Sequence, residues 1–300
     1  MAAQTTQAPI IVTDSTCDLP AAALKQYGIH VVPMNVHFGD ETYRCDGEMT
    51  LDQFFARLEQ GDQHPTTSPP SQELFAALYR DLGAENRPIL SIHVSARLSE
   101  TAAVARQVAE ASPGLAVTVV DSRTISGALG LQVLAAARAA AAGRAVEQIL
   151  PLLDQTFAAG NLMFVVDDLS YLHRGGRIGA IPFYVAQMLT VKPIAAISKE
   201  GETAGQFVPI GRARSLERAV GCFVSELEKE IGVGGALRAI VSYASADDGP
   251  TMPLVQRLKE KLEQRFECAL LEVMPVTPVL GVHTGQHAFA LGYAAGDWAV

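Results

Sequence analysis

The fold of this chain is decided by ILSIHVSARLSET at residues 89–101 and VTVVDSRTIS at residues 117–126. Each stretch runs from β-branched apolar residues through a cluster of hydroxyls into an alanine-rich helical pattern, which predicts a strand followed directly by a helix. Free backbone N–H groups and the partial positive charge at a helix start favour a carboxylate or a phosphate there. The alternative is that each Ser and Thr only caps its own helix. The repetition of such junctions favours a binding site.

Two further turns carry hydroxyl groups in the same way. Asp14, Ser15 and Thr16 follow an apolar strand pattern, where the alternative is a structural turn held by the Asp side chain. Thr67 lies ahead of Ser68 and two prolines, and the stiff loop that these form can hold its hydroxyl toward a ligand. A capped helix start explains Ser68 but leaves Thr67 without a role. The hydroxyls expected to add to the polar wall of the same site are those of Ser15, Ser68, Ser95 and Ser122.

Strands and helices alternate through the first half of the chain, which predicts a mostly parallel sheet with helices on both faces. Gly28 and Gly83 stand just past predicted helix ends, as helix-terminating glycines do. The predicted strands are residues 10–13, 30–38, 89–94 and 116–120, and the predicted helices are residues 21–27, 51–59, 71–82, 101–111 and one from Gly127.

The second half predicts another α/β domain, in which helices pack on a mixed sheet. The turn at residues 158–161 is the predicted boundary, which gives an N-terminal domain of residues 1–160 and a C-terminal domain of residues 161–300. The segment from Val279 to Ala294 closes this domain. A cleft between two α/β domains is a usual place for a small ligand, so we expect the site there.

The composition of the chain disfavours several classes of function. Its 300 residues include 23 basic and 32 acidic side chains, and the net charge of −9 disfavours nucleic acid or an anionic membrane surface as partner. No uncharged apolar run is long enough to span a bilayer, and residues 1–9 lack the pattern of a signal peptide. We therefore expect a cytoplasmic protein without membrane insertion. Its four cysteines and seven histidines have no metal-ligand spacing, so we expect no metal site.

Three polar motifs lie in the second half of the chain. Residues 172–179, LHRGGRIG, concentrate arginine and glycine, and arginine suits a carboxylate or a phosphate, although a solvated turn is the alternative. Arg214 lies in a similar basic turn, GRARS, at residues 211–215. His283 begins the sequence HTGQH. A lone histidine is more often structural, but His283 could donate to a carboxylate if it meets the first domain's hydroxyls across the cleft.

Taken in order, these motifs resemble the DegV family of fatty-acid-binding proteins over nearly the whole chain. The residues that carry the resemblance are IVTDST at 11–16, TTSPPS at 66–71, LSET at 98–101, DS at 121–122, YLHRGGRI at 171–178, GRARS at 211–215 and HTG at 283–285. The resemblance implies a two-domain protein that buries a long acyl chain in a tunnel. It also implies an acyl-carrying subunit of a bacterial fatty acid kinase.

The resemblance further implies roles for particular residues. By motif position, Thr67, Ser99 and His283 hold the carboxylate of the fatty acid. A separate kinase then supplies ATP and metal and phosphorylates that carboxylate, so this chain would need no cofactor and no catalytic residue of its own. Arg177 and Arg214 are candidates for the surface that faces the kinase or the acyl phosphate.

The sequence departs from the family pattern at two places. Glu100 replaces the glycine of the family's Leu-Ser-Gly-Thr, and because its charge would repel a carboxylate we expect its side chain to point away from the ligand. Gln286 and His287 replace the last two residues of the family's His-Thr-Gly-Pro-Gly.

Two other functions use the same residues. A serine hydrolase could combine Ser99 or Ser122 with His283, but the chain has no Gly-x-Ser-x-Gly elbow and no identifiable group to orient the histidine. A small phosphometabolite could bind at the helix starts, but neither GxGxxG nor GxxxxGK[ST] occurs. Fatty-acid binding is the function we expect.

Overall fold

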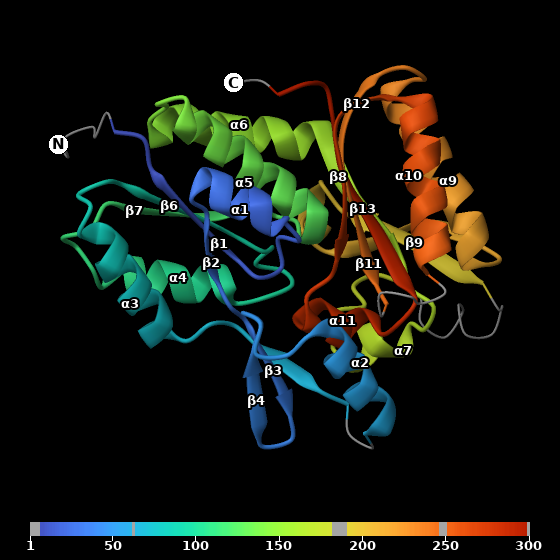
Figure 1. Ribbon diagram of the computed structural model, residues 1–300, viewed down its shortest axis with the longest axis horizontal. Coiled ribbons are helices and arrows are strands. Elements are labelled where there is room, and N and C mark those ends of the chain that lie inside the picture. Colours follow the sequence, from blue (N-terminus) through green and yellow to red (C-terminus); the bar gives the residue numbers. More distant parts are fainter. Residues whose placement is uncertain (1–6, 62–63, 182–190, 246–250, 299–300) are drawn as a thin grey trace.

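The chain folds into two α/β halves packed on either side of one helix, α5 (Ser126–Ala141), in the computed structural model shown in Figure 1. The structure describes residues 7–61, 64–181, 191–245 and 251–298. The N-terminal half holds a parallel sheet and the C-terminal half a mixed sheet. This confirms the predicted fold class.

The N-terminal sheet has the strand order β2-β1-β6-β7, and each neighbouring pair is parallel. Alternate residues of β1 face opposite sides: Ile10 and Val12 pack in the core that contains Phe75 of α3, whereas Ile11 packs in the core that contains Leu129 of α5. Helices therefore cover both faces, as predicted. The elements are β1 (Ile10–Asp14), α1 (Ala21–Tyr27), β2 (His30–Val32), α3 (Gln72–Gly83), β6 (Ile89–His93), α4 (Thr101–Glu110) and β7 (Val117–Asp121).

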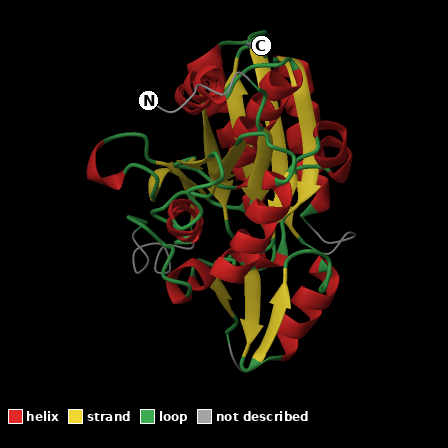
Figure 2. Cartoon of the chain, turned by 90° about the vertical axis from the view of Figure 1, so that its left-hand side faces the viewer, coloured by secondary structure: helices red, strands yellow, loops and turns green. Residues whose placement is uncertain are grey.

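A small lobe interrupts this half and corrects the prediction of one strand over residues 30–38. The segment divides into β2 and β3 (Asn35–Phe38) because Pro33 has no N–H group to continue a ladder. β3 pairs with β4 (Glu41–Arg44) and β5 (Thr66–Ser68) in an antiparallel sheet beside α2 (Leu51–Gln60), and Figures 1 and 2 show this sheet projecting from the molecule. The predicted loop at Thr66–Ser68 is thus a strand.

The C-terminal sheet has the strand order β10-β9-β8-β13-β11-β12. Among its described pairs, β11 and β12 are parallel and the others antiparallel. The closing segment, Val279–Ala294, includes a helix, α11, that the sequence pattern did not predict. The elements are α6 (Val146–Ala159), β8 (Gly160–Val165), α7 (Ser170–Arg174), β9 (Lys192–Ile197), β10 (Phe207–Ala213), α9 (Leu216–Ile231), β11 (Ala236–Ala244), α10 (Met252–Arg265), β12 (Glu267–Pro275), α11 (Pro278–Thr284) and β13 (Ala288–Ala295).

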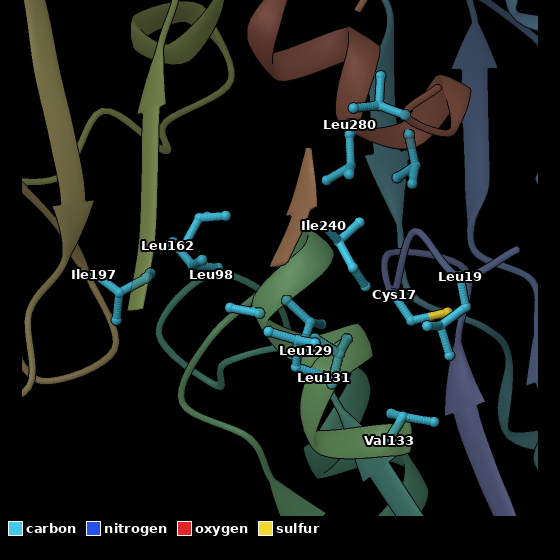
Figure 3. Packing of buried hydrophobic residues seen from close by; sticks show 14 of the residues in the cluster. Cys17, Leu19, Leu98, Leu129, Leu131, Val133, Leu162, Ile197, Ile240 and Leu280 are labelled. Atoms are coloured by element: carbon cyan, nitrogen blue, oxygen red, sulfur yellow. The ribbon is translucent and has the colours of Figure 1, made fainter. Parts of the chain in front are cut away.

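Helix α5 is buried along nearly its whole length because both halves pack against it. A Cβ atom on Gly130 would lie 2.4 Å from the backbone oxygen of Cys17, and one on Gly127 would lie 2.8 Å from Cβ of Ile240. Glycine is therefore required where the helix meets the loop after β1 and strand β11. Figure 3 shows Leu129 in the resulting core, which also contains Cys17 and Ile240. Residues from the two predicted domains thus share one core.

Candidate functional site

A cavity of about 540 Å³ lies between the two halves and the small lobe. Its exposed lining residues, among them Glu100 and Gly176, mark the mouth, and residues such as Leu162, Phe164 and Val276 form an apolar interior. The volume is in the range of sites for small apolar ligands with a few oriented polar groups.

The structure brings Thr67 and His283 together near this mouth, although 216 residues separate them. Thr67 Oγ1 and His283 Nε2 are 3.0 Å apart. Pairing of β5 with β3 holds Thr67, and α11 holds His283. Ser99 lies in the same cavity wall, where its Oγ is 2.8 Å from Thr101 Oγ1. All three predicted carboxylate ligands therefore line one cavity.

The surroundings of His283 favour the neutral form of its ring. Burial lowers the pKa of His283 to about 3, with smaller contributions from the charges of Arg177 and His64. Its Nδ1 atom has no hydrogen-bond partner within the described part of the chain. Gly175 lies against this atom, since a Cβ on Gly175 would be 2.2 Å from His283 Nδ1. A glycine at this position therefore allows the end of α7 to fix the ring.

Arg177 also lies in the cavity wall, whereas Arg214 does not. The Arg177 guanidinium donates from Nε to Leu98 O at 3.2 Å and from Nη1 to Gly175 O at 2.7 Å. Its cation thus lies at the polar end of the cavity, near His283. Arg214 lines a different, surface groove of about 660 Å³ beside α9 and α10. The structure does not bring the two arginines to one site.

Of the four serines predicted to add to the polar wall, Ser68 lines the cavity. Its Oγ lies 2.8 Å from His37 Nε2 and accepts from Asn35 Nδ2 at 3.2 Å. Ser68 therefore contributes a hydroxyl that is already bonded to the small lobe.

The prediction is wrong for Ser15, Ser95 and Ser122, which are outside the described cavity wall. Each hydroxyl bonds to the backbone instead. Ser15 Oγ accepts from Met34 N at 3.1 Å, Ser95 Oγ donates to Gly205 O at 2.9 Å, and Ser122 Oγ donates to Thr124 O at 3.1 Å. These three serines stabilise the backbone near the strand ends, which is the structural role given above as the alternative to ligand binding.

The cavity wall also contains polar residues that were not among the predicted ligands. Thr16, Ser126 and Ser242 are the buried ones, and Arg97, Glu100 and Thr284 are more exposed. Thr16 and Ser126 lie within hydroxyl-rich stretches of the sequence, so the sequence pattern could have indicated that they line the cavity. Ser242 lies in the middle of β11, where a serine does not reveal which face of the sheet it occupies.

The rival arrangement, a serine hydrolase with Ser99 or Ser122 bonded to His283, is not formed among the described residues. His283 bonds to Thr67, and Ser122 lies outside the described cavity wall. A Ser-His-Asp sequence of contacts does occur elsewhere: His93 lies 2.7 Å from Ser91 Oγ and 3.1 Å from Asp14 Oδ2. These three residues are fully buried. A buried serine that also accepts from Tyr79 OH has no access to a substrate, so this network is structural.

Within the described ranges, no cluster of three or more His, Cys, Asp or Glu side chains could hold a metal ion. Over the same residues, no helix combines the length and the apolar character needed to cross a membrane.

Comparison with known proteins identifies the family. A family model described as "Uncharacterised protein, DegV family" matches residues 10–296. The chain belongs to the DegV family. A DegV domain-containing protein of Streptomyces coelicolor is 36% identical over 278 residues, which cover 92% of this chain and 94% of the relative.

Two solved structures of DegV proteins have the same fold and are described by fatty acid binding. A DegV family protein from Thermus thermophilus, described by its fatty acid binding, is 30% identical with a TM-score of 0.85, over 96% of this chain and 99% of that one. DegV of Bacillus subtilis, described as a fatty acid binding protein, is 27% identical with a TM-score of 0.85, over 97% and 100% of the two chains.

The two departures from the DegV pattern lie close to the cavity. Glu100 is exposed and lies at the mouth of the cavity, and the direction of its side chain stays a prediction. Gln286 donates to Glu59 of α2 at 2.8 Å. His287, at the position of the pattern's last glycine, has a φ of 62°, a left-handed conformation that suits glycine.

Proposed function

We propose that this protein binds a long-chain fatty acid in the cavity between its two halves, with the carboxylate held by Thr67, Ser99 and His283. The observation that carries the proposal is the contact between Thr67 and His283 at the polar end of an otherwise largely apolar cavity. The fatty-acid-binding relatives from Thermus thermophilus and Bacillus subtilis support the same ligand class.

The two ends of the cavity contribute differently to binding. Burial of the acyl chain contributes about 0.8 kcal/mol for each CH₂ group, which supplies affinity without direction. The polar end supplies direction: a neutral His283 can donate one hydrogen bond, the Thr67 hydroxyl another, and the nearby Arg177 cation offsets the charge of the carboxylate. The carboxylate therefore lies toward the mouth and the chain toward the interior.

This orientation suits a protein that presents its ligand to another. A carboxylate at the mouth is accessible to a separate ATP-dependent fatty acid kinase, which would form the acyl phosphate, and the chain itself then needs no catalytic group or further cofactor. Arg177, at the polar end, is placed to contact the acyl phosphate, and Arg214, in its surface groove, is a candidate contact for the kinase. We expect this exchange in the cytoplasm.

Native and denaturing mass spectrometry of the purified protein tests the proposal. We expect a mass difference that matches one non-covalent fatty acid, released by solvent extraction and restored by adding fatty acid to the delipidated protein. Absence of both a bound acyl species and fatty-acid uptake would refute the proposal. Recovery of a nucleotide or a phosphorylated metabolite would favour the phosphometabolite site instead.

A second assay separates a carrier from an enzyme. Alone, the protein should neither hydrolyse p-nitrophenyl acyl esters nor consume ATP, because its described Ser-His-Asp network is fully buried and none of the three residues lines the cavity. Ester turnover that Ser99→Ala abolishes would contradict this expectation.

A further inference from the structure

One alanine in the floor of the cavity faces open space. Its strand, β13, is a central strand of the C-terminal sheet, since β8 and β11 pair with it on either side. Ala290 of this strand nevertheless stays partly exposed, whereas its neighbours Phe289 and Leu291 are 2% and 0% exposed. Side chains of a strand alternate between the two faces of the sheet. The exposed methyl group of Ala290 therefore points into the cavity, which this residue lines.

The residues on either side of this alanine limit the open space. In the register of the sheet, Ala290 lies opposite Ser242 on β11 and opposite Phe164 on β8. Ser242 is 0% exposed, so its side chain does not enter the space. Phe164 forms a side wall together with Phe207, and the centroids of these two rings are 4.6 Å apart. Within this row of the sheet, Ala290 is the position at which the floor leaves room for a ligand.

Helix α5 closes the floor beyond Ala290. The next residue of β13 on the same face is Gly292, and a Cβ atom there would lie 2.2 Å from the backbone nitrogen of Ala128. The first turn of α5 thus rests directly on the strand and leaves no room for an acyl chain between them. Ile125, which precedes this turn, also lines the cavity and is partly exposed. The open space at Ala290 therefore ends at the start of α5.

The direction of β13 relates this space to the carboxylate site. The strand begins at Ala288, close behind the helix α11 that carries His283, and it runs toward Gly292 under α5. A strand rises about 3.3 Å per residue, so Ala290 lies roughly 7 Å further along the strand than Ala288. With the carboxylate at His283, the far end of a bound acyl chain reaches Ala290 and Ile125.

We propose that Ala290 sets the length of the acyl chain that this protein accepts, because the end of the chain lies over its methyl group and stops at the first turn of α5. This inference rests on the proposed fatty-acid binding and adds a residue that determines which fatty acids bind. Each CH₂ group up to this stop should raise the affinity about fourfold by leaving water. A longer chain must bend back or displace α5. Affinity should therefore rise along a homologous series and then fall.

Calorimetric titration of the delipidated protein with saturated fatty acids from laurate to arachidate tests this inference. Ala290→Leu adds an isopropyl group that fills the space of about two to three CH₂ groups, so the longest chain that the unaltered protein accepts should bind about 15- to 60-fold more weakly. The preferred length should become shorter, and the affinity of the shortest acids should stay within about twofold. Ala109→Leu is the matched control, since Ala109 is a partly exposed alanine of α4 outside the described cavity wall. It should keep the length profile of the unaltered protein.

The outcomes separate this inference from the function on which it rests. An unchanged length profile in Ala290→Leu overturns the inference alone. Equal losses at every chain length do the same, because they show that the residue only obstructs entry. If no fatty acid binds to the unaltered protein, the proposed function fails and the inference fails with it.

Photolabelling of the unaltered protein gives a second test, which does not depend on whether Ala290→Leu folds. The probe is a saturated fatty acid with a diazirine at the end of its chain, and mass spectrometry of a digest locates the label. We expect labelled peptides that contain Ala290 or Ile125, which lie on different elements of the fold. Labels confined to residues of the mouth, such as Gly176, would overturn the inference.

Discussion

Replacement of Thr67 by valine tests the carboxylate site most directly, because valine keeps the shape of threonine and removes its hydroxyl. Thr67 Oγ1 and His283 Nε2 are 3.0 Å apart, so both can bond one carboxylate. A hydrogen bond to a charged group contributes about 1.5 to 3 kcal/mol. We therefore expect Thr67→Val and His283→Ala each to weaken fatty-acid binding by about ten- to a hundredfold.

The assay is calorimetric titration with a fatty acid and with the fatty alcohol of equal length. The alcohol lacks the charge, so it should bind the unaltered protein less tightly and lose less affinity on either substitution, in line with about 0.5 to 1.5 kcal/mol for a neutral hydrogen bond. Thr66→Val is the matched control, since Thr66 is the exposed neighbour of Thr67 on β5 and lies outside the described cavity wall. Equal losses for acid and alcohol would show that Thr67 and His283 shape the cavity and do not recognise the carboxylate.

Three further predictions concern the surroundings of the site and the stability of the fold. Gly175→Ala should weaken fatty-acid binding about as much as His283→Ala, because the added Cβ would displace the His283 ring. Gly221→Ala is the control: the space around its Cβ is open, so this variant should bind fatty acid normally in the same titration. Arg177→Ala should reduce both fatty-acid binding and phosphorylation by a cognate kinase, because Arg177 lines the cavity. Arg214→Ala should reduce phosphorylation alone, because Arg214 lies in the separate surface groove. Loss of bound lipid from the Arg214 variant would contradict its assignment to the kinase surface. Burial raises the pKa of Asp18 to about 7, above its value of about 4 in the unfolded chain. Between these two values the folded state binds one proton more than the unfolded state. The free energy of unfolding should therefore fall by a few kcal/mol as pH rises from about 4 to 7. Asp18→Asn should flatten this fall in urea titrations, and an unchanged pH profile would exclude Asp18 as its cause. Asp14 titrates outside this window, since bonds from His93, Thr16 and Val94 outweigh the effect of burial and lower its pKa, and its contribution is lost only as pH falls through that lower value.

The sequence predicted the parallel sheet because alternating strand and helix patterns leave few other arrangements. It did not predict the small lobe, since β5 is short and reads Thr66-Thr67-Ser68, a composition as typical of a turn as of a strand. The break at Pro33 is visible in the sequence, but an apolar run on both sides of it conceals that the two strands join different sheets.

Only some of the residues that line the site were predicted, because a local sequence pattern does not show which side chains face a cavity. Five hydroxyl residues lie in similar turns of the sequence: Ser15, Ser95, Ser122, Thr67 and Ser99. Only the folded chain shows that Thr67 and Ser99 line the cavity and that the other three do not. The pairing of Thr67 with His283 came from family resemblance, because no local pattern connects residues so far apart. No sequence pattern indicated Ser242, because its place beside the cavity depends on which face of β11 it occupies and on the approach of α5.

The position of α5 has a consequence for how a ligand could enter. The helix packs through Gly127 and Gly130 into one core with both sheets, so moving the halves apart would expose an apolar helix surface to water. Separating the two halves as rigid bodies about a hinge would therefore be unfavourable. We expect a ligand to enter through local displacement around the mouth, where the small lobe, α7 and α11 meet. For the same reason, neither half expressed alone would retain a complete core.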